Sequence, residues 1–165
     1  MRIGIGYDIH RVSERGELVL GGVTFPDFPQ LDGHSDADAV YHAIADALLG
    51  AAGLGDIGEH FPDDSECWRD ADSRQILSLA VRWVRECREL EPYNVDVNVL
   101  AQRPRIGERK KEMRRNIACL LDLPRCRVNV KARTGEKVGP IGRGEAIAAQ
   151  AVVLLEEING KEEED

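Results

Sequence analysis

Short runs of β-branched and apolar residues, some alternating with polar ones, predict four strands in this chain. Residues 2–8 (RIGIGYD) and 17–25 (ELVLGGVTF) are typical of strands, and the polar turn at 13–16 between them predicts a hairpin. Residues 94–101 alternate as a half-buried strand does, and residues 127–132 (RVNVKA) indicate another.

Apolar residues at helical spacing predict three helices. We expect the first to begin near Ser35 or Asp36 and to end at Gly53, the second to cover about 70–90, and the third about 108–121. The segment 145–158 is ambiguous, because its alanines and leucines favour a helix while its VVLL run allows a strand. Strands alternating with helices indicate one α/β or α+β domain with a sheet covered on one side.

Two segments are too rich in glycine and proline for regular structure. Residues 53–71 form a loop whose length is more often functional than accidental, and residues 134–145 (TGEKVGPIGRGE) form a glycine-rich loop. The charged end, residues 159–165, is predicted to be a disordered acidic tail. The folded domain is therefore expected to cover residues 1–158.

Composition narrows the class of protein. A length of 165 residues suits one domain, and a net charge of −8 argues against nonspecific nucleic-acid binding, which needs clustered lysine and arginine. The start does not resemble a signal peptide, and no apolar run approaches a membrane span. The four cysteines lack C-x-x-C spacing, which favours reduced, partly buried thiols. We therefore expect a cytoplasmic protein that does not bind membranes.

The candidate chemistry begins with Asp8 and His10, which stand two residues apart and so share one face of the first strand. Taken singly, these residues suit a solvated strand edge, and His42 suits a histidine near the core. Together they offer two imidazoles and one carboxylate, the ligand set of a catalytic Zn²⁺ or a non-haem Fe(II) site. His34 precedes the first helix, whose start favours anionic ligands.

Motifs for a protein nucleophile are missing from the sequence. It contains no G-x-S-x-G elbow, no G-x-x-x-x-G-K-[ST] loop and no cysteine beside a plausible base. If the protein is an enzyme, the attacking group comes from water or from the substrate. This pattern indicates metal-assisted phosphoryl or hydrolytic chemistry.

Four motifs, in order, resemble the 2-C-methyl-D-erythritol 2,4-cyclodiphosphate synthase family. They are G-x-G-Y-D-I-H, L-x-G-H-S-D-x-D-x-x-x-H-A-x-x-D-A-L-L-G-A-A, G-D-I-G-x-x-F-P-D and T-x-E-K-x-G-x-x-G-R-G-E, and the resemblance runs from Met1 to about Ile158. It implies a mixed four-stranded sheet with helices on one face and a small N-terminal hairpin, assembled as a homotrimer with active sites between subunits. It also implies that the ambiguous last segment is a strand, whose Ala146, Ala148 and Ala149 are candidate interface residues.

The resemblance implies a phosphorus–oxygen lyase of non-mevalonate isoprenoid biosynthesis. In that reaction the 2-phosphate of 4-diphosphocytidyl-2-C-methyl-D-erythritol 2-phosphate attacks the β-phosphorus of its own diphosphate. CMP leaves and a cyclic diphosphate forms. Such a substrate supplies its own nucleophile, and the two phosphate groups need screening of their mutual repulsion.

The resemblance also implies roles for residues. Asp8, His10 and His42 would hold Zn²⁺, Glu136 would hold Mg²⁺ or Mn²⁺, and His34 and Thr134 would be catalytic, stabilising the transition state. Besides Asp8, His10, His34, Thr134 and Glu136, the substrate-binding set comprises Ser35, Asp56, Ile57, Gly58, Phe61, Pro62, Asp63, Asp64, Ser65, Ala101, Gln102, Arg103, Pro104, Arg105, Ile106, Gly107, Arg133, Gly135 and Arg143. Among these, residues 101–107 would bind the cytidine.

The chain departs from the family pattern in two places. The family commonly has T-T-T-E where this chain has Arg133-Thr134-Gly135-Glu136. Pro140 stands where some members use an aromatic residue to hold an isoprenoid diphosphate in the trimer core, although Arg143 remains. A metal-dependent phosphoesterase and a non-catalytic metal-binding protein are the rival hypotheses.

Overall fold

A four-stranded mixed sheet forms the centre of the molecule. The computed structural model describes residues 1–62, 68 and 71–158. In spatial order the strands are β1 (Arg2–Arg11), β6 (Ala146–Glu157), β4 (Leu90–Leu100) and β5 (Val128–Arg133). β4 and β5 run parallel, and the other two pairs are antiparallel. The sheet confirms the predicted fold class, and β6 confirms that the ambiguous last segment is a strand.

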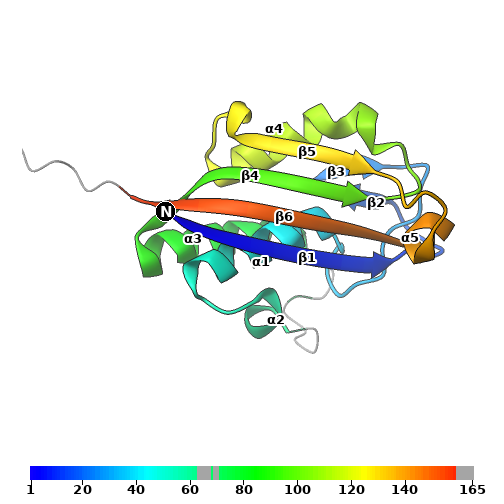
Figure 1. Cartoon of the computed structure of the whole chain (residues 1–165). Coiled ribbons are helices and arrows are strands. Elements are labelled where there is room, and N and C mark those ends of the chain that lie inside the picture. Colours follow the sequence, from blue (N-terminus) through cyan, green and yellow to red (C-terminus); the bar gives the residue numbers. More distant parts are fainter. Residues whose placement is uncertain (63–67, 69–70, 159–165) are drawn as a thin grey trace, which may run out of the picture.

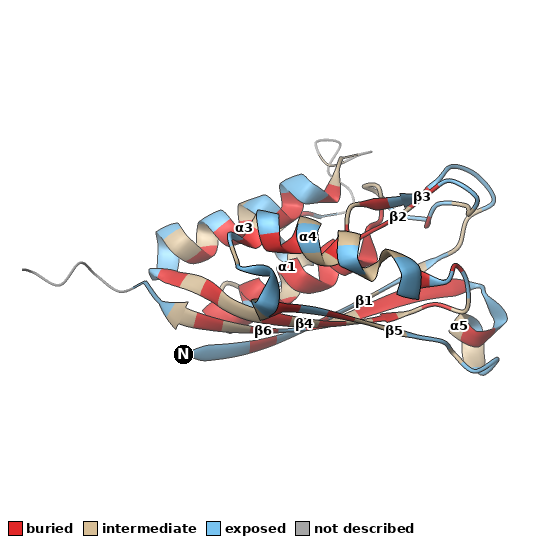
Figure 2. Cartoon of the chain, turned by 90° about the horizontal axis from the view of Figure 1, so that it is seen from above, coloured by how far each residue is buried: buried red, intermediate tan, exposed pale blue. Residues whose placement is uncertain are grey.

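Helices cover one face of this sheet, as Figure 2 shows. The three long ones are α1 (Ala39–Ala52), α3 (Ser73–Arg88) and α4 (Lys110–Leu121). Shorter helical turns lie in the connections between these elements: α2 (Ile57–His60), η2 (Ile106–Arg109), η3 (Arg125–Arg127) and α5 (Gly139–Arg143). The core lies between the helices and the sheet, and includes Ile44 and Leu48 of α1 and Val97 of β4, all fully buried.

The small hairpin lies elsewhere than the sequence predicts. β2 (Leu18–Leu20) and β3 (Val23–Phe25) pair with each other, whereas β1 pairs along its length with β6. The expected hairpin between residues 2–8 and 17–25 is therefore wrong. The turn residues Gly21 and Gly22 both have positive φ, as a two-residue type I′ turn requires, so the hairpin closes inside the second segment.

Asp38 determines where α1 begins. Its side chain accepts hydrogen bonds from the N–H groups of Val40 and Tyr41, so Asp38, and neither Ser35 nor Asp36, is the N-cap. The same carboxylate accepts the N–H groups of the β2–β3 turn at 2.8 and 2.7 Å. Residues 34–37 consequently lie outside the helix, and His42 lies in its first turn.

α1 packs directly on β1 because this strand carries glycine where the helix crosses it. A Cβ at Gly4 would lie 2.0 Å from the carbonyl oxygen of Ala47, and a Cβ at Gly6 would lie 2.0 Å from that of Ala43. Any larger side chain would push the helix away. The G-x-G of the first motif is therefore a packing requirement.

Several peripheral expectations can be compared with the described residues. None of the helices in that part of the chain is long and apolar enough to cross a membrane. Cys87, Cys119 and Cys126 are free thiols but exposed, so the expectation of partial burial is wrong for them. Cys67 and the predicted tail at 159–165 lie outside the described residues.

We predict that Gly6→Ala lowers the free energy of unfolding by about 2 kcal/mol or more, because the new methyl group overpacks the α1–β1 contact. Gly50→Ala is the matched control, since a Cβ there meets nothing within 4 Å, and it should stabilise the same helix by up to about 1 kcal/mol. Urea unfolding at one fixed protein concentration measures both. A Gly6→Ala protein within about 0.5 kcal/mol of wild type would show that the contact is not needed.

Candidate metal centre and substrate pockets

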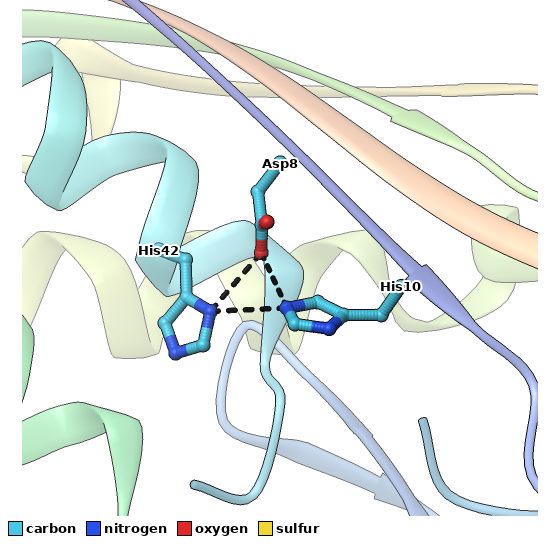
Figure 3. A group of neighbouring side chains, drawn as sticks. All are labelled: Asp8, His10 and His42. Atoms are coloured by element: carbon cyan, nitrogen blue, oxygen red, sulfur yellow. Dashed lines mark hydrogen bonds and ion pairs between the residues drawn. The ribbon is translucent and has the colours of Figure 1, made fainter. Parts of the chain in front are cut away.

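Three potential metal ligands converge beside the start of α1. Figure 3 shows Asp8 and His10 of β1 and His42 of α1 pointing toward one another. Asp8 Oδ2 lies 2.9 Å from His10 Nε2 and 3.0 Å from His42 Nδ1, and the two nitrogens are 3.4 Å apart. The three predicted ligands are therefore brought together.

The local fold explains this convergence. Alternate residues of β1 face the helices, so Gly4, Gly6, Asp8 and His10 form one row along the strand. α1 packs on Gly4 and Gly6. Asp8 and His10 are the next two residues of this row, and they lie beside His42 in the first turn of the helix.

A backbone carbonyl fixes the tautomer of His10. His10 Nδ1 lies 2.8 Å from the carbonyl oxygen of Asp32, which can only accept a hydrogen bond. The proton therefore sits on Nδ1, and Nε2 faces the other two ligands in the form that binds a metal.

The negative charge of Asp8 also suits metal binding. Burial opposes the ionisation of Asp8, but in the metal-free protein His10 and His42 in their protonated forms donate hydrogen bonds to this carboxyl, which outweigh burial and hold its pKa below the ordinary value. A bound cation would take the place of those two protons. One anionic oxygen and two imidazole nitrogens are the donor set of a divalent transition metal with open coordination positions. These residues fit such an ion.

A cavity of about 200 Å³ adjoins the metal ligands. His34 and Ser35 lie on its wall, as the sequence predicts, together with Ile57, Gly58 and Phe61 of the following loop. Trp68 and Ile76 also line it, and sequence reasoning did not place them there. Ile76 belongs to the apolar stripe of α3, a pattern that indicates core and carries no separate signal for a pocket.

The loop that forms the far wall is anchored to α1. Asp46, one turn after His42, accepts the N–H of Ile57 at 3.3 Å, and burial raises its pKa. Asp56 caps α2 by accepting the N–H of Glu59 at 2.9 Å and does not line the cavity, so its described contact is structural. Phe61 packs against Trp83 with ring centres 5.4 Å apart.

Pro62 ends the described part of this loop, and the predicted Asp63, Asp64 and Ser65 lie outside the described residues.

A second cavity, of about 330 Å³, lies between η2 and the ends of β4 and β5. It brings together most of the residues predicted to bind cytidine and neighbouring groups: Ala101, Gln102, Pro104, Arg105, Ile106, Gly107, Arg133 and Thr134. Glu108 and Ala132 also line it and were not predicted. Arg103 and Arg143 instead line a neighbouring cavity of about 320 Å³. The guanidinium of Arg143 donates to both carboxylate oxygens of Glu145.

The loop after β5 has its own geometry. Thr134 Oγ1 donates a hydrogen bond to the exposed carboxylate of Glu136. At Gly135 a Cβ would lie 2.4 Å from the backbone nitrogen of Gly142 in α5. Glycine at position 135 therefore matches a close approach between this loop and α5.

The two cavities lie far apart in one chain. β1 and β5 are the opposite edges of the sheet, as Figure 1 shows, so three strand spacings of about 4.8 Å separate them. Among the described residues that line the first cavity, neither Thr134 nor Glu136 is found. A single chain therefore does not unite the predicted metal centre with the predicted catalytic threonine.

Fold and site together define the class: a mixed α/β protein with an Asp-His-His triad that could hold a metal ion at the edge of its sheet. Residues 1–156 match the model of the YgbB family. The 2-C-methyl-D-erythritol 2,4-cyclodiphosphate synthase of Laribacter hongkongensis is 56% identical over 94% of this chain and 96% of that protein. The chain belongs to the YgbB family.

Solved structures agree with this assignment. The bifunctional IspDF of Campylobacter jejuni is 44% identical with a TM-score of 0.89, and the match covers 93% of this chain but only 42% of that longer one. IspF of Plasmodium falciparum in its CDP complex is 38% identical with a TM-score of 0.82, and the match covers 96% of this chain and 97% of that one.

We predict that the metal-free protein takes up one Zn²⁺ per chain and that Asp8→Ala or His42→Ala lowers this content well below one. Removing one of three ligands leaves too few donors for tight binding. Elemental analysis after desalting measures the content. His60→Ala is the control, because His60 contacts the carbonyl of Leu54 instead of this centre, and it should keep full zinc. Full zinc in Asp8→Ala would show that the ligand assignment is wrong.

Proposed function

We propose that this protein is a 2-C-methyl-D-erythritol 2,4-cyclodiphosphate synthase. The observation that carries the proposal is the convergence of Asp8, His10 and His42 in a chain that is 56% identical to such a synthase. Its substrate would be 4-diphosphocytidyl-2-C-methyl-D-erythritol 2-phosphate, and its products the cyclic diphosphate and CMP. We further propose the cytosol as its compartment.

The residues that face the first cavity would position the phosphates of the substrate. Asp8, His10 and His42 would hold Zn²⁺, which supplies Lewis-acid polarisation of a phosphate oxygen. His34 and Ser35 lie on the same wall and would donate hydrogen bonds to phosphate oxygens. The hydrophobic side chains of Phe61 and Ile57 would exclude water from the other side, which protects the reaction from hydrolysis.

The substrate provides the nucleophile in this scheme. An oxygen of its 2-phosphate forms a new bond to the β-phosphorus, and the bond from that phosphorus to the CMP oxygen breaks, so CMP leaves with the electron pair. No protein nucleophile is needed, which agrees with the lack of nucleophile motifs in the sequence. The protein contributes position and charge screening.

The second cavity would hold the cytidine end. Its lining residues at 101–102 and 104–107 come from the connection after β4 and from the start of η2, and the CDP complex of the Plasmodium falciparum relative supports a cytidine nucleotide as ligand. Thr134 and Glu136, hydrogen-bonded to each other, would act at the diphosphate, Glu136 by holding Mg²⁺ or Mn²⁺ and Thr134 by stabilising the transition state.

A homotrimer would bring the two cavities together. The face of the sheet without helices exposes a row of large apolar residues of β1, with Ile3 72% and Ile5 64% exposed. Tyr7 and Ile9 continue the row, and such a contiguous apolar surface is typical of an interface. Head-to-tail closure about this face would place the second cavity of one chain beside the first cavity of its neighbour.

The alanines of β6 are weaker interface candidates than this row. Ala148 and Ala149 are already fully buried within one chain, and Ala146 is 8% exposed.

The product distinguishes the proposed synthase from its rivals. With the cytidyl substrate, Zn²⁺ and Mg²⁺, we expect CMP and the cyclic diphosphate in equal amounts, identified by mass spectrometry. A phosphoesterase would release CMP together with a linear diphosphate or inorganic phosphate, since water would be the nucleophile. A protein that binds zinc without turnover would be the non-catalytic homologue. Either result would refute the synthase assignment.

Co-expression of two inactive variants tests whether one active site is built from the cavities of two neighbouring chains. His42→Ala inactivates the first cavity and the double variant Thr134→Ala/Glu136→Gln inactivates the second. In randomly mixed trimers half of each kind of cavity is intact, so about a quarter of the wild-type activity should return.

Co-expression of Thr134→Ala with Glu136→Gln is the matched control for this experiment. Both changes affect the same hydrogen-bonded pair beside the second cavity, so this mixture should recover nothing beyond its parents. If the first mixture also recovers nothing, each chain works with its own two cavities and the shared site is wrong.

A further inference from the structure

The ring of His42 is held from behind by hydroxyl groups. Its Nδ1 faces Asp8 and His10, whereas its Nε2 lies 2.9 Å from Ser73 Oγ and 3.1 Å from Ser35 Oγ. Ser73 is the first residue of α3 and is fully buried. A helix distant in sequence from β1 and α1 thus contacts one of the metal ligands.

A carboxylate stands behind Ser73. Ser73 Oγ donates to Asp36 Oδ1, which also accepts the N–H of Ser73 at 3.3 Å and that of Asp38 at 3.2 Å. The N–H of Asp36 in turn donates to the carbonyl of Ala71 at 3.0 Å. These contacts fix Asp36 between the starts of α1 and α3.

The direction of these hydrogen bonds determines the tautomer of His42. A hydroxyl has one proton, and since Ser73 gives it to a carboxylate, its oxygen accepts from the ring. With a cation bound at Nδ1, the proton of His42 therefore sits on Nε2 and points at Ser73. In the metal-free protein Asp8 Oδ2, 3.0 Å from Nδ1, also attracts a proton to that nitrogen. A negative charge behind the ring also makes Nδ1 a stronger donor to a cation.

We propose that Ser73 and Asp36 are positioning residues that fix the tautomer and orientation of His42 and thereby strengthen metal binding. The inference rests on the proposed metal centre. Ser73 contributes more to the orientation of the His42 ring than Ser35 does. The Ser35 hydroxyl also accepts the N–H of Ala37, at 3.2 Å, and contacts no carboxylate directly. Motif reasoning did not reveal Ser73, because it stands alone at the start of an amphipathic helix.

Zinc affinity of the purified protein tests this proposal. Competition with a chromophoric zinc chelator gives the dissociation constant, and we expect Ser73→Ala to raise it by about 10- to 100-fold. Asp36→Asn keeps an acceptor for the Ser73 hydroxyl but loses the charge, so it should raise the constant by a smaller factor. Ser78→Ala, an exposed serine of the same helix, is the matched control and should leave it unchanged.

A second readout separates positioning from loss of structure. In the zinc-saturated proteins, the ¹H–¹⁵N signal of His42 Nε2–H should exchange slowly with water in wild type and faster in Ser73→Ala, because the buried acceptor of this proton is then lost. If Ser73→Ala does not fold, the zinc affinity of Asp36→Asn decides the question.

The outcomes are distinguishable. If wild type binds zinc tightly and the dissociation constants of Ser73→Ala and Asp36→Asn lie within twofold of its value, the positioning role is wrong and the metal centre stands. Wild type that fails to bind zinc overturns the metal centre of the proposed function and the positioning role with it.

Discussion

The contact between α1 and β1 is the constraint on which the rest of the site depends. Gly4 and Gly6 leave no side chain between strand and helix, so the helix backbone lies directly on the strand. That closeness places His42 within hydrogen-bond distance of Asp8, whose side chain belongs to the same row as the glycines. Asp38 adds the second constraint, because it caps the N-terminus of α1 and so starts the helix at a point from which His42 faces the row. The metal centre is thus a direct result of backbone packing.

The sheet divides the chemistry between its two edges. The metal centre lies at the β1 edge, and the cavity with Thr134 lies at the β5 edge. A reaction that needs both therefore requires a second chain, and the exposed apolar row of β1 gives a physical reason for that chain to associate. One strand therefore carries both features, with the potential metal ligands on one face and the exposed apolar row on the other.

Much of the fold and of the candidate site could be predicted from the sequence, and each wrong or missing prediction has a physical cause. The spacing of Asp8 and His10 predicts a shared face, and the chemistry of the ligand set points to His42 as their partner before the family motifs imply the same. Local propensity could not decide β6, because its alanines suit a helix and only pairing with β1 and β4 makes it a strand. The hairpin was misplaced because the Gly21-Gly22 turn was overlooked within an apolar run. Ser73 and Trp68 were missed because nothing local marks a residue whose role depends on a tertiary contact.

A crystal structure of the zinc-loaded protein with CDP would test the central claim most directly. The account predicts zinc bound by Asp8, His10 and His42 of one chain at about 2.0–2.2 Å. It predicts the cytosine ring between residues 101 and 107 of a neighbouring chain, with the diphosphate reaching the zinc. Zinc bound at other residues, or CDP contacting both cavities of a single chain, would contradict it.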